Sequence, residues 1–155
     1  FNEPQKSAEL WEHGWLHTGD VATLDDFGFI DIRDRIKDVI KTGGEWLSSL
    51  ELEDLISRHA AVREVAVVGI PDPQWGERPF ALLVLREGQA LDAKGLKEYL
   101  IPFVELGHIN KWAIPSQIAI VTDIPKTSVG KLDKKRIRLD IAQWQTAGSA
   151  FLSTL

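Results

Sequence analysis

The chain has 155 residues, which fits one domain, or one domain with an appended piece of another. Its composition, 44% hydrophobic and 26% charged, excludes a disordered or fibrous protein. The absence of cysteine excludes disulfides, a thiolate metal site and a thiol nucleophile. A net charge of −5, with both signs spread along the chain, argues against nucleic acid as the main partner.

Hydropathy indicates no transmembrane segment, because no apolar run approaches the roughly 18 residues that span a membrane. The polar, acidic N-terminus resembles neither a signal peptide nor a transit peptide. Because the lack of cysteine suits a reducing compartment, we expect a cytoplasmic protein. The chain also lacks methionine, so we expect a processed or truncated product of a longer protein.

A β-hairpin is predicted from Val21 to Ile36. Two short runs of alternating apolar residues flank the turn residues Asp25, Asp26 and Gly28. The charged link at residues 34–38 follows, and it marks the predicted end of a structural unit.

This link divides the chain into two expected domains, residues 1–35 and residues 36–155. A short strand at 39–40 opens the second domain. Ser48 and Glu51 then form a capping box, and the helix that they begin should end near residue 59.

A second helix is capped by Asp92, and Pro102 should kink or split it. Strands are predicted over the apolar runs Val62–Ile70, Phe80–Leu85 and Ile118–Val121.

Residues 124–133 form a predicted loop rich in Pro, Gly, Ser and Thr. A basic helix from Lys134 to about Trp144 is the last predicted element of the second domain. Strands and helices alternate throughout. The sequence therefore predicts an α/β (α+β) fold, a short mixed sheet flanked by helices and preceded by a β-hairpin.

Two features near the boundary suit a nucleotide. Asp20 follows a Thr18-Gly19 turn, where a carboxylate can accept hydrogen bonds from the vicinal hydroxyls of a ribose; the alternative is a solvated turn residue. The planar fork of Arg35 can reach a ribose or phosphate; the alternative is a salt-bridged surface link.

Two glycine-containing segments suit close approach by a ligand. The glycines of Lys41-Thr42-Gly43-Gly44-Glu45 admit positive φ, although an ordinary turn fits these residues equally well. Gly130-Lys131 does not belong to a Walker loop, because Pro125 and Leu132 stand where that motif needs Gly and Ser or Thr. Lys131 is then a flexible cation suited to an oxyanion or phosphate, or a solvated loop lysine.

The sequence predicts no metal site and no nucleophile motif. The histidines have no HxH, HExxH or His-carboxylate spacing, and no G-x-S-x-G occurs. Basic residues crowd together near the end of the chain: Lys131, Lys134, Lys135, Arg136 and Arg138.

Five segments, in order, resemble the C-terminal third of adenylate-forming enzymes, which include acyl-CoA ligases, adenylation domains and beetle luciferases. The resemblance covers about Gly14 to Arg138. One such motif alone is weak, whereas five in order are specific. The segments are GWLHTGD, DRIKDVIKTGGE, ELE, VAVVGIPDPQWGERP and IPKTSVGKLDKKRIR.

The resemblance implies a two-step reaction. ATP and a carboxylic acid give an acyl-adenylate and pyrophosphate, and the thiol of CoA then displaces AMP. ATP/AMP, CoA and Mg²⁺ are the implied cofactors, with the magnesium ligands in a large N-terminal domain. Residues 1–35 resemble the tail of that domain, and residues 36–155 resemble the mobile domain that rotates between the two steps.

The resemblance also implies roles for single residues in the adenylation step. Asp20 and Arg35 resemble the residues that contact the ribose of ATP and AMP. Lys37 falls at the hinge between the domains. Lys131 resembles the catalytic lysine that bridges the substrate carboxylate and the phosphate.

For the thioester step, Lys41, Gly43 and Gly44 resemble the segment that faces the site, where glycine lets the pantetheine pass. Two positions depart from the common pattern. Ser49 stands where many ligases have proline, and Lys37 stands where Asp is more frequent. The segment GGEWLSSLELE is more similar to bacterial medium-chain fatty-acyl and related short-acid CoA ligases.

The implied partners are the chain's own N-terminal domain and a small carboxylic acid, and we expect the chain alone to be inactive. Two alternatives stay open: an adenylation domain that loads a carrier protein, and a non-catalytic interaction module. Against the module stands the joint presence of four residues that packing does not need: Asp20, Arg35, Gly44 and Lys131.

Overall fold

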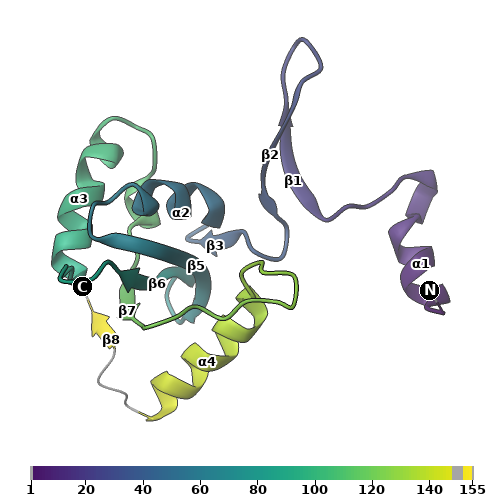
Figure 1. The fold of residues 1–155 in the computed structure, drawn as a ribbon. Helices are drawn as coiled ribbons and strands as arrows, with labels where there is room; N and C mark the ends of the chain where they lie inside the picture. The colour runs from purple at the N-terminus through teal and green to yellow at the C-terminus, as the bar shows by residue number, and fades with distance from the viewer. Residues whose placement is uncertain (1, 148–151, 155) are drawn as a thin grey trace. The chain divides into compact units, whose positions relative to one another are not determined.

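In the computed structural model, which describes residues 2–147 and 152–154, the chain divides into two compact units, Phe1–Lys37 and Asp38–Leu155 (Figure 1). The boundary suggested by the sequence lies two residues earlier, between residues 35 and 36. The two domain ranges assigned from the sequence also include residues 1, 148–151 and 155, which lie outside the described residues.

The first unit contains two short helical segments and the β-hairpin. The helical segments are α1 (Pro4–Leu10) and η1 (Glu12–Gly14), neither of which the sequence predicted. The predicted hairpin is confirmed, since β1 (Asp20–Leu24) and β2 (Ile30–Arg35) pair antiparallel.

An Asx turn closes this hairpin. The Asp25 carboxylate accepts hydrogen bonds from the backbone N–H groups of Phe27 and Phe29, each at 2.9 Å. The Phe27 and Phe29 side chains are 88% and 73% exposed, and no apolar side chain of this unit is buried among its described residues. A lone two-stranded hairpin is only marginally stable in water, so exposed apolar side chains of this kind suit contact with other protein surface.

The second unit is built on one mixed sheet of six strands. The strand order is β4-β3-β6-β7-β8, with β5 also paired to β6. β6 pairs antiparallel with β5 and parallel with β7. The strands are β3 (Ile40–Thr42), β4 (Glu45–Leu47), β5 (Val62–Asp72), β6 (Gly76–Leu85), β7 (Gln117–Ile120) and β8 (Leu152–Thr154). The helices are α2 (Ser49–Ser57), α3 (Ala93–Glu105), η2 (Lys111–Ala113) and α4 (Lys134–Ala147).

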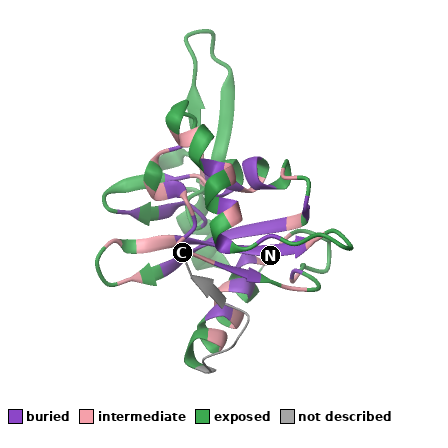
Figure 2. Cartoon of the chain, turned by 90° about the vertical axis from the view of Figure 1, so that its left-hand side faces the viewer, coloured by how far each residue is buried: buried purple, intermediate pink, exposed green. Residues whose placement is uncertain are grey.

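Helices cover both faces of the sheet, as the buried central strands in Figure 2 illustrate. Leu52 of α2 and Leu100 of α3 pack into one core cluster. Phe80 of β6 packs with Ile137 and Ile141 of α4 in the other. Burying a side chain of this size contributes about 1.5–3 kcal/mol. Burial on both faces explains why the central strands are almost continuously apolar.

Ser48 caps α2, which confirms the half of the predicted capping box that Ser48 supplies. Ser48 Oγ accepts a hydrogen bond from the backbone N–H of Glu51 at 3.1 Å. The helix ends at Ser57, slightly before the predicted end. His59 instead takes part in the turn toward β5, where its ring accepts a hydrogen bond from the N–H of Ala61.

Of the two effects predicted for Pro102, a kink or a split in α3, the split does not occur. Asp92 caps the helix as predicted, and the helix then runs through Pro102 to Glu105. Pro102 lies near the end of the helix and removes one hydrogen bond, the one to the carbonyl of Glu98, an exposed residue. The helix closes normally beyond it, because the N–H of Leu106 donates to the Pro102 carbonyl at 3.0 Å.

Several strands differ from the prediction in extent. β4, η2 and β8 were not predicted, because three residues are too few to show a hydrophobic period. β5 continues through Pro71, which suits a strand paired on one side only.

Candidate functional site

Asp20 and Arg35 lie side by side at the open end of the β1–β2 hairpin. They are cross-strand partners, and Arg35 Nε lies 3.6 Å from Asp20 Oδ1. Their side chains are 25% and 58% exposed, respectively. The buried Asp34 accepts a hydrogen bond from the Arg35 N–H at 2.7 Å and fixes the backbone there. An accessible carboxylate beside a guanidinium fork can bind vicinal hydroxyls and an adjoining phosphate.

Lys37 is the last residue of the first compact unit, and Asp38 is the first of the second. Asp38 is buried, and its Oδ1 accepts a hydrogen bond from Arg138 Nη2 of α4 at 2.9 Å. Asp38 is therefore anchored in the second unit. An anchored residue directly after Lys37 is consistent with a hinge at Lys37.

Gly43 and Gly44 form the tight turn between β3 and β4. Thr42 pairs with Glu45 across this turn, and the φ angles of the glycines are 57° and 87°, as a two-residue hairpin turn requires. A Cβ on Gly43 would lie 3.2 Å from the ring of Trp75, whereas a Cβ on Gly44 would meet nothing within 4 Å. Gly44 therefore presents bare backbone to open space.

Lys41 lies on β3 beside this turn. Its backbone N–H donates to Glu77 Oε2 at 2.9 Å. Its ammonium lies 5.1 Å from the ring centroid of Trp46, its cross-strand partner, in a cation–π contact. The turn is thus flanked by an exposed cation and an exposed indole.

Lys131 lies in the predicted loop before α4, at the end of a turn that is hydrogen-bonded within itself. Lys126 and Leu132 are bridged at the base of this turn. The N–H of Thr127 donates to the Lys131 carbonyl at 2.7 Å, and the N–H of Lys131 donates to Thr127 Oγ1 at 3.2 Å. The Lys131 side chain is exposed, and its ammonium has no ion pair among the described residues. A fixed backbone thus carries a free cation, which suits neutralisation of charge on an anionic ligand.

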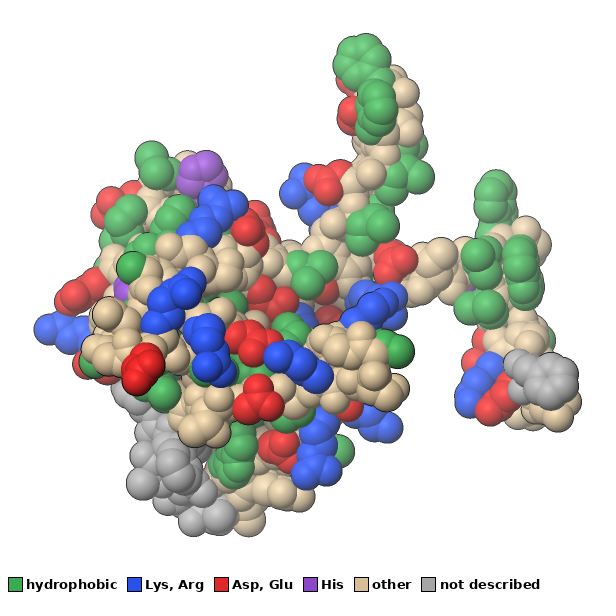
Figure 3. Space-filling model, in the orientation of Figure 1, with side chains coloured by type: hydrophobic (Ala, Val, Ile, Leu, Met, Phe, Trp, Pro, Cys, Tyr) green, Lys and Arg blue, Asp and Glu red, His purple; other side chains and the backbone are tan. Residues whose placement is uncertain are grey.

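Most other basic residues of the same region are neutralised by carboxylates. Figure 3 shows basic and acidic side chains interspersed on this face of the second unit. The ion pairs are Lys134 with Glu53 at 2.8 Å, Arg136 with Asp140 at 2.8 Å and Arg138 with Asp38 at 2.9 Å. The crowding of positive charge seen in the sequence is therefore largely cancelled.

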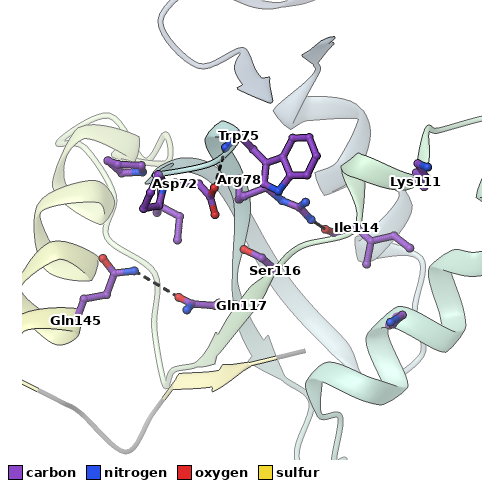
Figure 4. A pocket seen from close by; sticks show the side chains of 12 residues that line it. Asp72, Trp75, Arg78, Lys111, Ile114, Ser116, Gln117 and Gln145 are labelled. Atoms are coloured by element: carbon purple, nitrogen blue, oxygen red, sulfur yellow. Dashed lines mark hydrogen bonds between the residues drawn. The ribbon is translucent and has the colours of Figure 1, made fainter. Parts of the chain in front are cut away.

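A pocket that the sequence reasoning missed lies beside the glycine turn. The N–H of Gly43 donates to the Trp75 carbonyl at 2.9 Å, and Trp75 lines the pocket. The pocket has a volume of about 540 Å³ (Figure 4). Basic and amide side chains come from β6, β7, α3, α4 and η2, and Trp75 comes from the turn before β6, whereas β5 contributes apolar residues and the Asp72 carboxylate. It therefore forms only when the whole unit is assembled.

One aromatic ring and several cations line this pocket, and a second ring packs against the first. The rings of Trp75 and Trp112 lie 4.5 Å apart, and Lys111 Nζ lies 4.8 Å from the Trp112 centroid. Arg78 donates to the Ile114 carbonyl at 3.3 Å, while its buried Nε has no hydrogen-bond partner among the described residues. These groups suit a phosphorylated, heteroaromatic ligand. In the sequence, the segment VAVVGIPDPQWGERP contains Trp75 and Arg78, but it was used only for the family resemblance and no pocket was expected there.

The expected site residues fall into three groups on separate elements. No hydrogen bond or ion pair within the described part of the second unit joins the glycine turn to Lys131. The groups are Asp20 with Arg35 on β1–β2, Lys41 with Gly43 and Gly44 on β3–β4, and Lys131 in the turn before α4.

Two kinds of feature are absent from residues 2–147 and 152–154. No group of three or more His, Cys, Asp or Glu side chains is placed to hold a metal ion. None of the helices there combines the length and the apolar character needed to cross a membrane.

Known proteins resemble this chain in sequence and in fold. Residues 51–131 match the family described as AMP-binding enzyme C-terminal domain. The 3-methylmercaptopropionyl-CoA ligase of Ruegeria lacuscaerulensis is 43% identical over 133 residues, and the long-chain-fatty-acid–CoA ligase of Thermus thermophilus is 41% identical over 137 residues. These alignments cover 86% and 88% of this chain, and 24% of each relative. The crystal structure of ATP-bound MatB from Rhodopseudomonas palustris superimposes with a TM-score of 0.79 at 28% identity, covering 90% of this chain and 27% of that one.

The mixed sheet, its flanking helices and these matches define the small C-terminal domain of the adenylate-forming enzymes. The chain belongs to the AMP-binding enzyme C-terminal domain family. The resemblance drawn from five sequence segments and the predicted fold class are both confirmed. The chain spans about a quarter of the length of the curated relatives that it matches.

Proposed function

We propose that this chain is the C-terminal part of an ATP-dependent, AMP-forming acyl-CoA ligase. The observation that carries the proposal is the exposed, unpaired Lys131 ammonium on a hydrogen-bonded turn, in a chain of this family. The names of two relatives, both CoA ligases, support the same reaction. The name of the Thermus thermophilus relative, together with the GGEWLSSLELE segment, favours a fatty-acyl substrate for this ligase.

In the first half-reaction, a carboxylate oxygen of the acid attacks the α-phosphorus of ATP. The bond between that phosphorus and the pyrophosphate oxygen breaks, giving acyl-adenylate and pyrophosphate. Negative charge gathers on the phosphate oxygens in this step, so the Lys131 ammonium stabilises it. Asp20 and Arg35, adjacent on the hairpin, would hold the ribose.

In the second half-reaction, the CoA sulfur attacks the acyl carbon, the bond to the AMP oxygen breaks, and the thiol proton is lost. We assign Gly43 and Gly44 to the passage of the pantetheine, because a narrow channel needs the missing side chains. Rotation about Lys37 would bring the Lys131 turn and the glycine turn to the same site one after the other.

The pocket beside the glycine turn supports this assignment. Its cations, Arg78 and Lys111, suit the phosphates of CoA, and the Trp75 ring, which packs against Trp112, suits its purine. Trp75 lines the pocket, and its carbonyl accepts a hydrogen bond from the N–H of Gly43. A long ligand bound in this pocket would therefore extend past the glycine turn.

The Mg²⁺ that accompanies ATP would be held outside the described residues, in an N-terminal domain that we take to be the principal partner of this chain. A carboxylic acid is the proposed small-molecule partner. The cytoplasmic location and the absence of a nucleic-acid partner stay predictions of the sequence.

The test uses the full-length enzyme that contains this chain. ATP–pyrophosphate exchange is measured over a panel of carboxylic acids for the wild type, Lys131→Ala and the matched variant Lys135→Ala, an exposed lysine of α4. We expect acid-dependent exchange that falls roughly hundredfold in Lys131→Ala and stays near wild type in Lys135→Ala. Thioester formation from supplied acyl-adenylate should change far less.

Equal losses in the two half-reactions would contradict domain rotation, and no exchange with any acid would contradict the ligase assignment. Supplying either CoA or a phosphopantetheinylated carrier protein as the thiol then separates a CoA ligase from the carrier-loading alternative.

A further inference from the structure

Lys134 is a buried lysine three residues beyond Lys131, at the start of α4. Its Nζ donates to Ser49 Oγ at 2.7 Å and lies 2.8 Å from Glu53 Oε1. The side chains of Lys134 and Glu53 are 10% and 12% exposed, and Ser49 is fully buried. The first residue of α4 is thereby joined to α2.

Glu53 extends this connection into the sheet. The same Oε1 atom accepts a hydrogen bond from the backbone N–H of Val67, in β5, at 2.8 Å. A single carboxylate therefore links α2, α4 and β5. Because α2 and β5 are packed in the core, the position of Lys134 is fixed relative to both.

Stability alone does not account for this ion pair. The desolvation of two charges can exceed their mutual attraction, and apolar residues of similar size often hold such a position better. α4 is already anchored by the buried Ile137 and Ile141. The ion pair instead fixes the orientation of the start of α4, because hydrogen bonds accept only a narrow geometry. The start of α4 is also the end of this helix nearest Lys131.

The other end of the Lys131 turn is held in a similar way. Ile124 is fully buried, and Lys126 Nζ lies 2.8 Å from Glu64 Oε1 of β5. The hydrogen bond to Glu64 raises the pKa of the Lys126 ammonium, so this lysine remains charged. Lysine–glutamate pairs therefore tether the turn to the sheet and to α2 on both sides of Lys131.

We propose that Lys134, held by Ser49 and Glu53, is a positioning residue for Lys131 in the adenylation half-reaction. This inference rests on the proposed function. Lys134 acts through the backbone, by fixing where the Lys131 turn joins α4. Misplacing a reacting group by about 1 Å can cost roughly a hundredfold in rate, so such a tether has a measurable effect.

The experiment compares three variants in the full-length enzyme. Lys134→Met removes the charge with little change in volume, but it leaves the Glu53 carboxylate buried without its lysine. Lys134→Met/Glu53→Gln removes both charges and keeps an amide oxygen for the Val67 N–H. Lys135→Met, an exposed neighbour on the same helix, is the matched control. Each is assayed for pyrophosphate exchange, for thioester formation from supplied acyl-adenylate, and for thermal unfolding.

We expect the double variant to lose about tenfold or more in exchange, with thioester formation and the unfolding temperature close to those of Lys135→Met. Equal losses in both half-reactions, with a lower unfolding temperature, would show that the pair is only structural and overturn the inference. A double variant that exchanges like Lys135→Met would overturn it as well. If the wild type shows no acid-dependent exchange, the proposed function fails, and the positioning role fails with it.

Discussion

Ser49 Oγ accepts a hydrogen bond from Lys134 Nζ at 2.7 Å, although the two residues lie 85 positions apart. Ser49 is the first residue of α2, a position where proline is also well tolerated. The helix itself therefore does not require serine there. The hydroxyl serves the buried lysine, which gives a physical reason for this departure from the common family pattern.

Ser49→Ala should therefore destabilise the chain by about 1–3 kcal/mol, because it leaves a buried charged donor without one of its acceptors. The measurement is the free energy of unfolding in urea. Ser57→Ala is the control, since Ser57 donates to the Asp54 carbonyl at an exposed position. Equal effects of the two substitutions would show that Ser49 contributes nothing through Lys134.

Gly44→Leu should slow thioester formation selectively, if the glycine turn borders the path of the pantetheine. A Cβ at Gly44 meets no protein atom within 4 Å, so the loss would arise from the ligand path rather than from a clash. Gly88→Leu is the matched control: Gly88 also has positive φ, at 71°, and open space around it. Both substitutions should cost about 1–2 kcal/mol of stability through the left-handed backbone. Similar thioester rates in the two variants would contradict the channel role.

Asp20→Asn should raise the KM for ATP about tenfold, because a charged acceptor for ribose hydroxyls becomes neutral. Asp31→Asn is the control on the same hairpin, where Asp31 pairs with Arg33 at 3.1 Å. The measurement is the KM for ATP of each variant, from steady-state pyrophosphate exchange at varied ATP concentration. An unchanged KM in Asp20→Asn would remove Asp20 from the nucleotide site.

The Lys126–Glu64 pair predicts a pH dependence of stability. The hydrogen bond to Glu64 raises the pKa of Lys126 above its ordinary value of 10.5 in the folded state. The folded state therefore holds this proton more tightly, so the contribution is complete below about pH 10.5 and is lost as pH rises through the folded pKa. Glu64→Gln lacks that contribution and should lose less stability than the wild type above this pH. Urea unfolding midpoints on both sides of it provide the measurement.

Glu87→Gln is the control for this series, because Glu87 is exposed and makes no ion pair within the described part of the chain. It should follow the wild type at every pH. A Glu64→Gln variant that also follows the wild type would contradict the stabilising role of the pair.

The sequence by itself determined the features that depend on near neighbours. The Asp25 turn, the Ser48 cap of α2 and the cap of α3 at Asp92 each rest on hydrogen bonds that span only a few residues. The apolar runs of β5 and β6 required burial on both faces, and the five ordered segments identified the family before any contact was known.

Only the tertiary structure decided which distant residues meet. Lys134 reaches Glu53, and Gly43 reaches Trp75, because the strand order and the helices on both sheet faces bring them together. Pro102 does not split α3 for a related reason: the effect of a proline depends on where the helix ends. Hydrogen bonds between neighbours are set by local backbone preferences, whereas pairings across the fold depend on how the whole core packs.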